Sequence, residues 1–498
     1  AAAGPEICWV PEADRRPGAG VRKRRLNMAP YKWQASEDIF RLFHSIGQAS
    51  LLYDIQDSHS GNMAIRWKNA QGEEMVVITA TGSQKGDLEP NHLCYLSPGE
   101  TDFGYYKASS ETDIHVNILS LPGAQASMHA HVKELIMATL DDQPAPKTPP
   151  PFVPVDPLAF YHLGPEIPVD WFAVPSGSPE MAKTIPARLA DHPLTIIYGH
   201  GAMTRGRTLK ETFFNLCLAN NAGYIVRLIE RQIRSTRAKR HALKTPEKQE
   251  KNLAREAPLP VGQSPELEEL RSKIKAAPES HFHFRPTPYN TDIENRCDFP
   301  EEDEILKEFR KTGNRLFESR LSPFHTGSMS VRGVDYLLYA PQASMPYEVG
   351  GPLLKLPLAP NPGDDTELLL HKKIYAESDF QALIHAYVPE AEAHAHFIYP
   401  GEETPIEKII PVDAEGIFMY LVIPVLPPEF DEDRLISLLH DYRVVVVRGG
   451  GVWAVGGLSL SEALHHPSSL REICLYRLAA VERGLDLRKM EPEKAKKW

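Results

Sequence analysis

Residues 107–132 read KASSETDIHVNILSLPGAQASMHAHV and place many ionisable side chains within one apolar-patterned segment. The last ten residues, 123–132, are mostly small and apolar and follow a proline, which predicts a buried strand. Because alternate residues of a strand point to the same face, His129 and His131 would lie side by side and could bind one divalent cation. Core or surface histidines give the same pattern, so both interpretations stay open at this point.

A third histidine follows a second predicted strand. Residues 194–198 (LTIIY) are apolar, and a glycine on each side of His200 permits a tight turn at the strand end. Residues 208–213 (TLKETF) then begin a helix. Three neutral imidazoles with an open fourth position form a zinc site of the catalytic type. The alternative interpretation of His200 is a turn residue bonded to the backbone.

The first half of the opening stretch predicts the start of a helix. Ser110, with Asp113 three residues later, resembles a capping box. The free backbone amides of such a helix end, with the hydroxyls of Ser109 and Ser110 beside them, attract phosphate. Glu111 lies in the first turn, where it suits proton transfer but would equally complement the helix dipole. His115 is expected to be structural.

The composition is that of an ordinary globular protein. The chain has 498 residues, of which 42% are hydrophobic, and this length predicts two or three domains. The formal net charge of -11 is spread along the chain, which argues against nucleic acid as the main partner. No apolar run is long enough to span a membrane. Five cysteines without a CxxC pair indicate neither a disulfide framework nor a cysteine zinc site, and they fit a reducing, cytoplasmic location.

The chain contains an internal repeat. Three pairs of segments resemble each other and occur in the same order: 58–66 with 324–332, 109–119 with 365–375, and 127–132 with 383–388. This order predicts a duplicated domain of roughly 200 residues. We therefore expect four parts: a flexible tail at 1–33, a metal-binding domain at 34–235, a charged linker at 236–300, and a degenerate domain at 301–490.

These motifs together resemble the class II aldolase and adducin family, and within it the L-fuculose-phosphate aldolases. The resemblance covers two stretches, residues 40–235 and, more faintly, 300–485. In that family an HxH pair and a distant histidine before glycine hold zinc, which is similar to His129, His131 and His200. Mn²⁺ or Co²⁺ suits the same ligands. The family's catalytic glutamate follows a Ser-Ser pair, as Glu111 does here.

The resemblance also implies a phosphate site, a fold and an activity. The positions that match the family's phosphate ligands are Gly61, Asn62, Thr81, Gly82, Ser109 and Ser110. The implied fold is a three-layer α/β/α domain with a central, mainly antiparallel sheet, present twice. The implied activity is a metal-dependent lyase that cleaves a phosphorylated ketose by retro-aldol chemistry through a metal-stabilised enediolate. The alternatives are an epimerase or dehydratase of a phosphorylated ketose on the same zinc site, or an adducin-like interaction protein without catalysis.

The second copy departs from the pattern. His385 corresponds to His129, but Tyr387 replaces the second histidine, and residues 448–457 offer only glycine in place of the third. Asp365 and Ser328 stand where Ser109 and Asn62 stand in the first copy, and an aspartate would repel phosphate. Glu367 is expected to be a helix-start carboxylate. We therefore expect no zinc in the second copy.

The resemblance further implies an assembly. Members of the family form fourfold rings whose sites lie between neighbouring subunits. The neighbouring subunit supplies a tyrosine to each site. We accordingly expect a homo-oligomer, either a dimer of tandem chains that forms a pseudo-fourfold ring or a higher assembly. Tyr420, Tyr442 and Tyr476 are the candidates for that tyrosine.

Overall fold

The computed structural model describes residues 37–57, 59–69, 71–97, 107–140, 148–244, 264–277, 303–345 and 353–497. The expected tail at residues 1–33 lies outside these ranges. None of the described helices has both the length and the apolar character that crossing a membrane requires.

The first copy is built on a seven-stranded sheet, antiparallel except for the parallel pair β5 and β6. In spatial order its strands are β3 (Leu93–Leu96), β2 (Glu74–Thr79), β1 (Asn62–Lys68), β4 (Ala126–Ala130), β7 (Gly201–Gly206), β6 (Leu194–Ile197) and β5 (Val169–Asp170). The central strand β4 is the one predicted from the opening stretch. All of its residues are buried, because the sheet is covered on both faces.

Helices cover both faces of this sheet and give the expected three layers. One face carries α1 (Glu37–Leu52), α3 (Lys133–Thr139), α4 (Pro157–Leu163) and α6 (Leu209–Lys244), and the other carries α2 (Thr112–Leu119) and α5 (Pro179–Asp191). Side chains such as Met128 and Phe213 form the core under α6. Ile118 and Ile185 pack with Met203 under the other layer.

The second copy repeats this architecture, which confirms the predicted duplicated α/β fold. Its strands, in spatial order, are β10 (Leu354–Pro357), β9 (Tyr336–Ala340), β8 (Ser328–Arg332), β11 (Ala382–Ala386), β15 (Gly451–Gly456), β14 (Val444–Val447), β13 (Ile423–Leu426) and β12 (Lys408–Ile409). Its helices are α8 (Asp303–Glu318), α9 (Thr366–Ala376), α10 (Pro389–Ala395), α11 (Ala414–Met419), α12 (Glu432–Tyr442), α13 (Leu460–Glu482), α14 (Leu487–Met490) and α15 (Glu493–Lys496). The corresponding strands and helices follow the order of the first copy.

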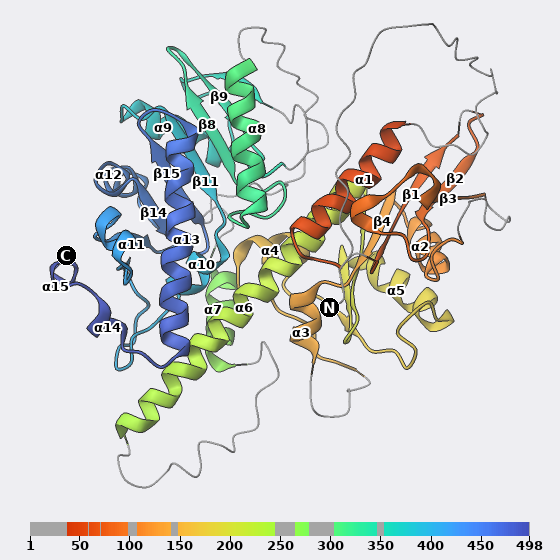
Figure 1. Cartoon of the computed structure of the whole chain (residues 1–498), viewed down its shortest axis with the longest axis horizontal. Helices are drawn as coiled ribbons and strands as arrows, with labels where there is room; N and C mark the ends of the chain where they lie inside the picture. The colour runs from red at the N-terminus through yellow and green to blue at the C-terminus, as the bar shows by residue number, and fades with distance from the viewer. Residues whose placement is uncertain are drawn as a thin grey trace, which may run out of the picture.

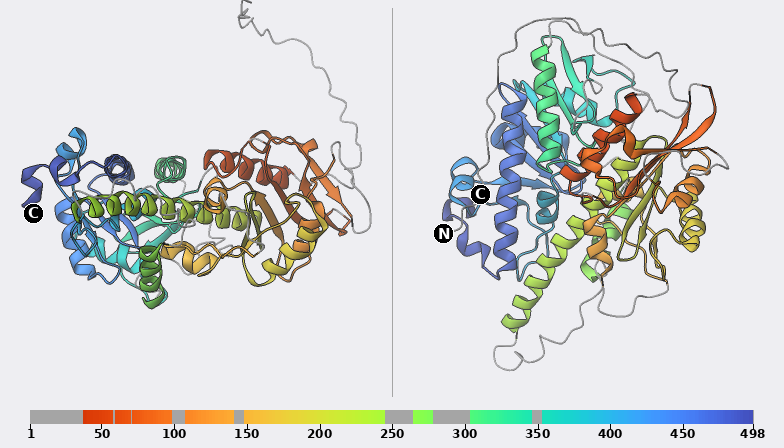
Figure 2. Two further views of the ribbon diagram at one scale, coloured as in Figure 1. Left: turned by 90° about the horizontal axis from the view of Figure 1, so that it is seen from below. Right: turned by 45° about the vertical axis from the view of Figure 1, so that its right-hand side comes forward.

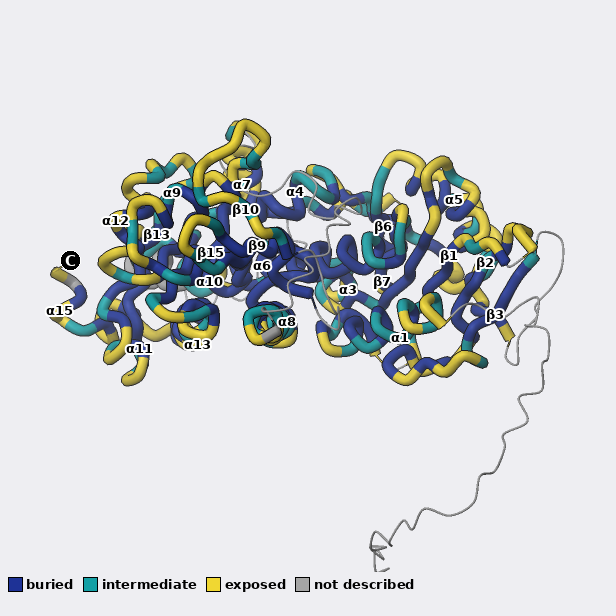
Figure 3. The backbone as a smooth tube through the Cα atoms, turned by 90° about the horizontal axis from the view of Figure 1, so that it is seen from above, coloured by how far each residue is buried: buried dark blue, intermediate teal, exposed yellow. Residues whose placement is uncertain are grey.

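The two copies share one core. The long helix α6 leaves the first sheet and continues along the second copy, where it packs on α10 and α13 (Figures 1 and 2). The ring of Tyr53 stacks on Phe317 with centroids 4.8 Å apart, and Phe213 contacts Phe324 at 4.9 Å. Figure 3 shows buried backbone at this junction, including much of α6. The second copy therefore packs directly against the first through apolar side chains.

The segment expected to be a linker, residues 236–300, is partly helical. Helix α6 continues to Lys244, beyond the expected domain end at 235. Within the segment, α7 (Pro265–Ala276) begins at Ser264, whose hydroxyl caps it, and buries Leu267 in the core of the first copy. The remaining residues of the segment, 245–263 and 278–300, lie outside the described ranges. Charge and proline content concealed the amphipathic pattern of α7.

Candidate metal centre and its surroundings

Three histidines converge at one edge of the first sheet. His129 is the penultimate residue of β4, His131 directly follows the strand, and His200 lies in the turn between β6 and β7. One ring nitrogen from each lies within 4.8 Å of those of the other two. The turn needs glycine at Gly201, which has φ of 150° and where a Cβ atom would lie 2.4 Å from the carbonyl oxygen of Ala130.

Two of the three histidines have a buried ring nitrogen without a hydrogen-bond partner. Nδ1 of His129 donates to the carbonyl oxygen of Ala202 at 3.0 Å, so its Nε2 carries a lone pair, and this buried Nε2 has no hydrogen-bond partner. Nδ1 of His200 is also buried without a partner. Burial lowers the pKa of His129, His131 and His200 to about 4, so all three are neutral at pH 7. Neutral imidazoles with orphaned lone pairs fit a divalent cation.

Glu111 lies beside this cluster. It occupies the N-cap position of α2 and is 3% exposed, and its Oε2 accepts a hydrogen bond from Nδ2 of Asn62 at 2.9 Å. The same oxygen lies 3.8 Å from Nε2 of His129, while the buried Oε1 has no partner. Burial raises the pKa of the Glu111 carboxyl above its ordinary value. A carboxyl group in this setting is suited to accept and return a proton.

The residues matched to phosphate ligands lie in three loops that meet next to Glu111. Asn62, at the start of β1, donates to Oγ of Ser109 at 2.9 Å. Thr81, just after β2, donates from Oγ1 to the carbonyl oxygen of Ala108 at 2.8 Å. Gly61 (φ 70°) precedes Asn62 and Gly82 (φ 72°) follows Thr81, while Ser110 is exposed. Hydrogen bonds from Asn62 and Thr81 thus bring the loops together beside Glu111.

Two details of the helix start differ from the sequence prediction. The predicted capping box is wrong: α2 begins at Thr112, and its N-cap residue Glu111 makes no side-chain cap. Ser109 takes part in the turn instead, because its Oγ accepts from the amide of Glu111 at 3.2 Å. Asp113 is left on the exposed face of the helix.

His115 is buried, as expected for a structural residue, but it also supports the site. Its Nε2 bonds to Oδ1 of Asn62 and its Nδ1 bonds to Oγ of Ser127 at 2.5 Å. Burial lowers the pKa of His115 to about 3, so the ring is neutral. With Oδ1 held by this ring, the amide nitrogen of Asn62 faces Ser109 and Glu111. The sequence signal for this role is the echo of His115 at His371 in the second copy.

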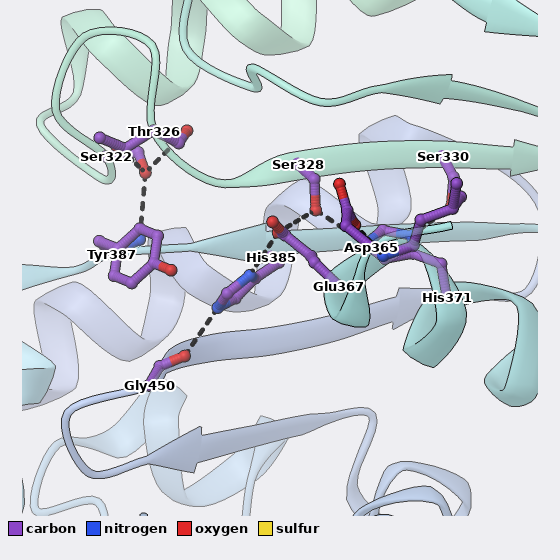
Figure 4. A network of polar contacts seen from close by, with 11 residues as sticks. Ser322, Thr326, Ser328, Ser330, Asp365, Glu367, His371, His385, Tyr387 and Gly450 are labelled. Atoms are coloured by element: carbon purple, nitrogen blue, oxygen red, sulfur yellow. Dashed lines mark hydrogen bonds and ion pairs between the residues drawn. The ribbon is translucent and has the colours of Figure 1, made fainter. Parts of the chain in front are cut away.

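The equivalent place in the second copy is closed (Figure 4). Nδ1 of His385 bonds to Oε1 of Glu367 at 2.7 Å, and Nε2 donates to the carbonyl oxygen of Gly450 at 2.7 Å. Both ring nitrogens of His385 are therefore occupied, and Nδ1 forms a buried ion-pair contact with the Glu367 carboxyl group. Ser328 donates to the same carboxylate and also bonds to His371. No nitrogen of His385 remains for a metal.

Glu367 differs from the simple helix-start carboxylate that the sequence predicted. It lies in the first turn of α9, as expected, but Asp365 caps this helix by accepting from the amide of Leu368 at 2.8 Å. Glu367 is 2% exposed and faces His385. The carboxylate is therefore part of the core of the second copy.

Comparison with known proteins gives a family match in both copies. The family of the class II aldolase and adducin N-terminal domain matches residues 42–225 and 307–478. Among solved structures, an L-fuculose-1-phosphate aldolase from Thermus thermophilus is 21% identical (TM-score 0.32) over 37% of this chain and 90% of its own. A sugar-phosphate aldolase from Thermotoga maritima is 17% identical (TM-score 0.32) over 37% and 92%. No curated protein matches the chain.

Proposed function

Because the chain belongs to the class II aldolase and adducin family, we propose that its first copy is a metal-dependent lyase that cleaves a phosphorylated ketose by retro-aldol chemistry. The observation that carries this proposal is the convergence of three neutral imidazoles, two of them with orphaned buried nitrogens, beside the buried carboxyl of Glu111. A non-catalytic, adducin-like role gives no reason to keep this set, so we rank it below catalysis.

In this proposal each group of the site has a distinct task. His129, His131 and His200 would hold Zn²⁺, with Mn²⁺ or Co²⁺ as alternatives. Such a metal, when bound, supplies Lewis-acid stabilisation for negative charge on substrate oxygens. Glu111 moves the proton, and Asn62, oriented by His115, positions its carboxylate.

The phosphate end of the substrate would lie among the three loops described above. The loops present the backbone and side chains of Gly61, Asn62, Thr81, Gly82, Ser109 and Ser110. The amino end of α2 lies next to them, and the helix dipole favours an anion there. An epimerase or a dehydratase of a phosphorylated ketose would use the same residues and is the second candidate.

Two measurements test the proposal. Elemental analysis should find a divalent metal at one equivalent per chain, because among the described residues three imidazoles converge on one point in the first copy alone. A panel of ketose 1-phosphates and 5-phosphates, assayed for triose products, should then separate lyase from epimerase and dehydratase. Glu111→Gln should keep the metal and lose roughly 10²-fold or more in turnover, a typical general acid-base contribution. Absence of metal, or full turnover in Glu111→Gln, would remove this mechanism.

We further propose that two chains pair through faces that the internal duplication leaves uncovered. Every residue of α10 is buried beneath α6, whereas in its counterpart α3 only Leu135 is buried, and Met137 is 41% exposed. Helix α13 is the counterpart of α6 in the second copy. By analogy with α6 on α10, we expect α13 of a second chain to cover α3. Two chains paired this way place four copies around one ring.

This pairing selects one tyrosine. Tyr476 lies 17 residues after the capping residue Ser459 of α13, as Ile225 lies 17 after Thr208 at the start of α6. Ile225 is buried against the degenerate site of the second copy, next to Tyr387. Tyr476 is 47% exposed, whereas Tyr420 is buried and bonds to His466 at 2.7 Å. We propose that Tyr476 of the partner subunit lines the metal centre.

The pairing is tested by light scattering during size-exclusion chromatography. The wild type should elute as a dimer or a larger assembly, and Tyr476→Glu should shift it toward the monomer. The matched control is Val334→Glu, which changes another exposed apolar residue, 96% exposed, outside the paired faces. A monomeric wild type, or equal behaviour of the two variants, would contradict the pairing.

A further inference from the structure

Lys85 is a buried cation that the proposed mechanism does not use. It begins the short helix η1 (Lys85–Asp87) and is 1% exposed. Its Nζ donates to the carbonyl oxygens of His59 at 3.0 Å and Ser83 at 2.7 Å. Among the described residues, no carboxylate lies within ion-pair distance of it. Burying an ammonium group without a counter-ion is costly, so this lysine needs a compensating anion or a structural reason.

The two acceptors of Lys85 belong to the loops of the proposed phosphate pocket. His59 lies two residues before Gly61, and Ser83 directly follows Gly82. The Lys85 ammonium group thus bridges the two loops and places a positive charge beside them. No other described lysine or arginine bridges these loops.

Helix α1 fixes the position of this cation. A Cβ atom on Gly47 would lie 1.9 Å from the carbonyl oxygen of Lys85, so α1 touches the backbone of η1 directly. A Cβ atom on Gly86 would lie 2.2 Å from Cδ1 of Leu51. The backbone of Lys85 therefore cannot move away from the loops without repacking α1.

The second copy shows what the site is like without the cation. Gly313 of α8 corresponds to Gly47, and its Cβ atom would meet the carbonyl oxygen of Ala343 at 2.5 Å. Ala343 thus stands in the place of Lys85. Here the two loops bond to each other directly, because the amide of Ala343 donates to Gly327 at 3.2 Å and that of His325 donates to Ser344 at 2.8 Å. The copy that carries Asp365 in place of a pocket serine has therefore also lost the cation.

We propose that Lys85 is a positioning residue of the phosphate pocket, whose ammonium group bridges the two loops in register and supplies the buried positive charge that attracts a phosphate monoester. This inference rests on the proposed function, because it assumes the phosphate pocket. It adds the charge that the six matched ligands, all neutral, lack.

The charge state of Lys85 provides a readout that a purely structural role would not give. Burial lowers the pKa of Lys85 to about 8, and the nearby Asp57 acts in the opposite direction. The other titratable groups that face it are His129 and His131, whose pKa of about 4 leaves them neutral above pH 7. His44 of α1 bonds to the carbonyl oxygen of Leu88 at the end of η1. Anion affinity should therefore fall between pH 7 and pH 9.

The experiment measures sulfate binding to the full-length, metal-loaded protein by calorimetry, because sulfate does not titrate between pH 7 and pH 9. Lys85→Met should weaken sulfate binding at pH 7 by about 10-fold or more, as expected for the loss of a charged hydrogen-bond donor. Its metal content should stay unchanged. The matched control is Lys372→Met, which removes the other buried lysine, bonded to Asp364 and Ala359 in the second copy.

The possible results separate this inference from the function it rests on. Equal sulfate affinity in the wild type and Lys85→Met would overturn the role of Lys85 and leave the pocket intact. Absence of sulfate and phosphate binding in the wild type would overturn the pocket, and the role of Lys85 with it. If Lys85→Met does not fold, the wild type decides alone: affinity that is constant from pH 7 to pH 9 overturns the proposal.

Discussion

Glu367→Gln should destabilise the protein far more than Glu111→Gln, although the two glutamates occupy equivalent positions in the two copies. Glu367 forms a buried ion-pair contact with His385 at 2.7 Å and accepts a hydrogen bond from Ser328, and both partners are fully buried. The glutamine variant removes the negative charge from this buried contact. Glu111, in contrast, has a buried Oε1 without a partner, and its Oε2 accepts only from Asn62.

The size of the difference follows from the burial of the pair. Breaking a buried ion pair by removing one partner costs about 3–5 kcal/mol. For a domain of this size, such a loss corresponds to a decrease in Tm of roughly 6–20 °C. In metal-free protein, Glu111→Gln removes a buried charge whose pKa is already raised by burial, and the new amide oxygen still accepts from Asn62. Its stability should stay within about 1 kcal/mol of the wild type.

The assay is thermal unfolding of the chelated protein, followed by far-ultraviolet circular dichroism. Tryptophan fluorescence gives a local signal, because Trp453 stacks on His385 with ring centroids 4.1 Å apart. Spectra at low temperature control for the fold of each variant. Equal losses in Glu367→Gln and Glu111→Gln, or a loss below about 1 kcal/mol in Glu367→Gln, would refute the assignment of a buried ion pair to the second copy.

Three further outcomes are expected. His131→Ala should abolish the single equivalent of bound zinc, whereas His385→Ala should leave it, because His385 offers no free nitrogen; elemental analysis distinguishes the two. Ser110→Asp should weaken phosphate binding in calorimetry without loss of Tm, because Ser110 is exposed and the new carboxylate repels the anion. Burial raises the pKa of Asp156 from its ordinary 3.8 to about 7, so the protonated form is favoured in the folded state and stability should fall as pH rises from about 4 to 7. Asp156→Asn should remove that part of the pH dependence of the free energy of unfolding, measured with urea.

The sequence, together with its resemblance to a known family, was sufficient for the fold and for the convergence of three histidines. A ten-residue apolar run with an HxH pair predicts a central strand and adjacent imidazoles, because the period of two along a strand is a local property. The internal repeat predicts two similar domains for the same reason, since each copy keeps its own strand and turn signals. His200 followed from a strand end and two glycines, which are also local.

Only the tertiary structure decided what these local pieces do together. Sequence reasoning set His115 aside as structural, but from α2 it bonds to Asn62 of β1 and orients its side chain. It passed over Lys85 entirely, because the contacts to His59 and Ser83 depend on how two loops and α1 pack. It expected Glu367 to be a helix-start carboxylate, whereas the fold buries it against His385. Partners distant along the chain carry no local pattern, and burial, which fixes charge and hydrogen bonding, exists only once the sheets and helices have come together.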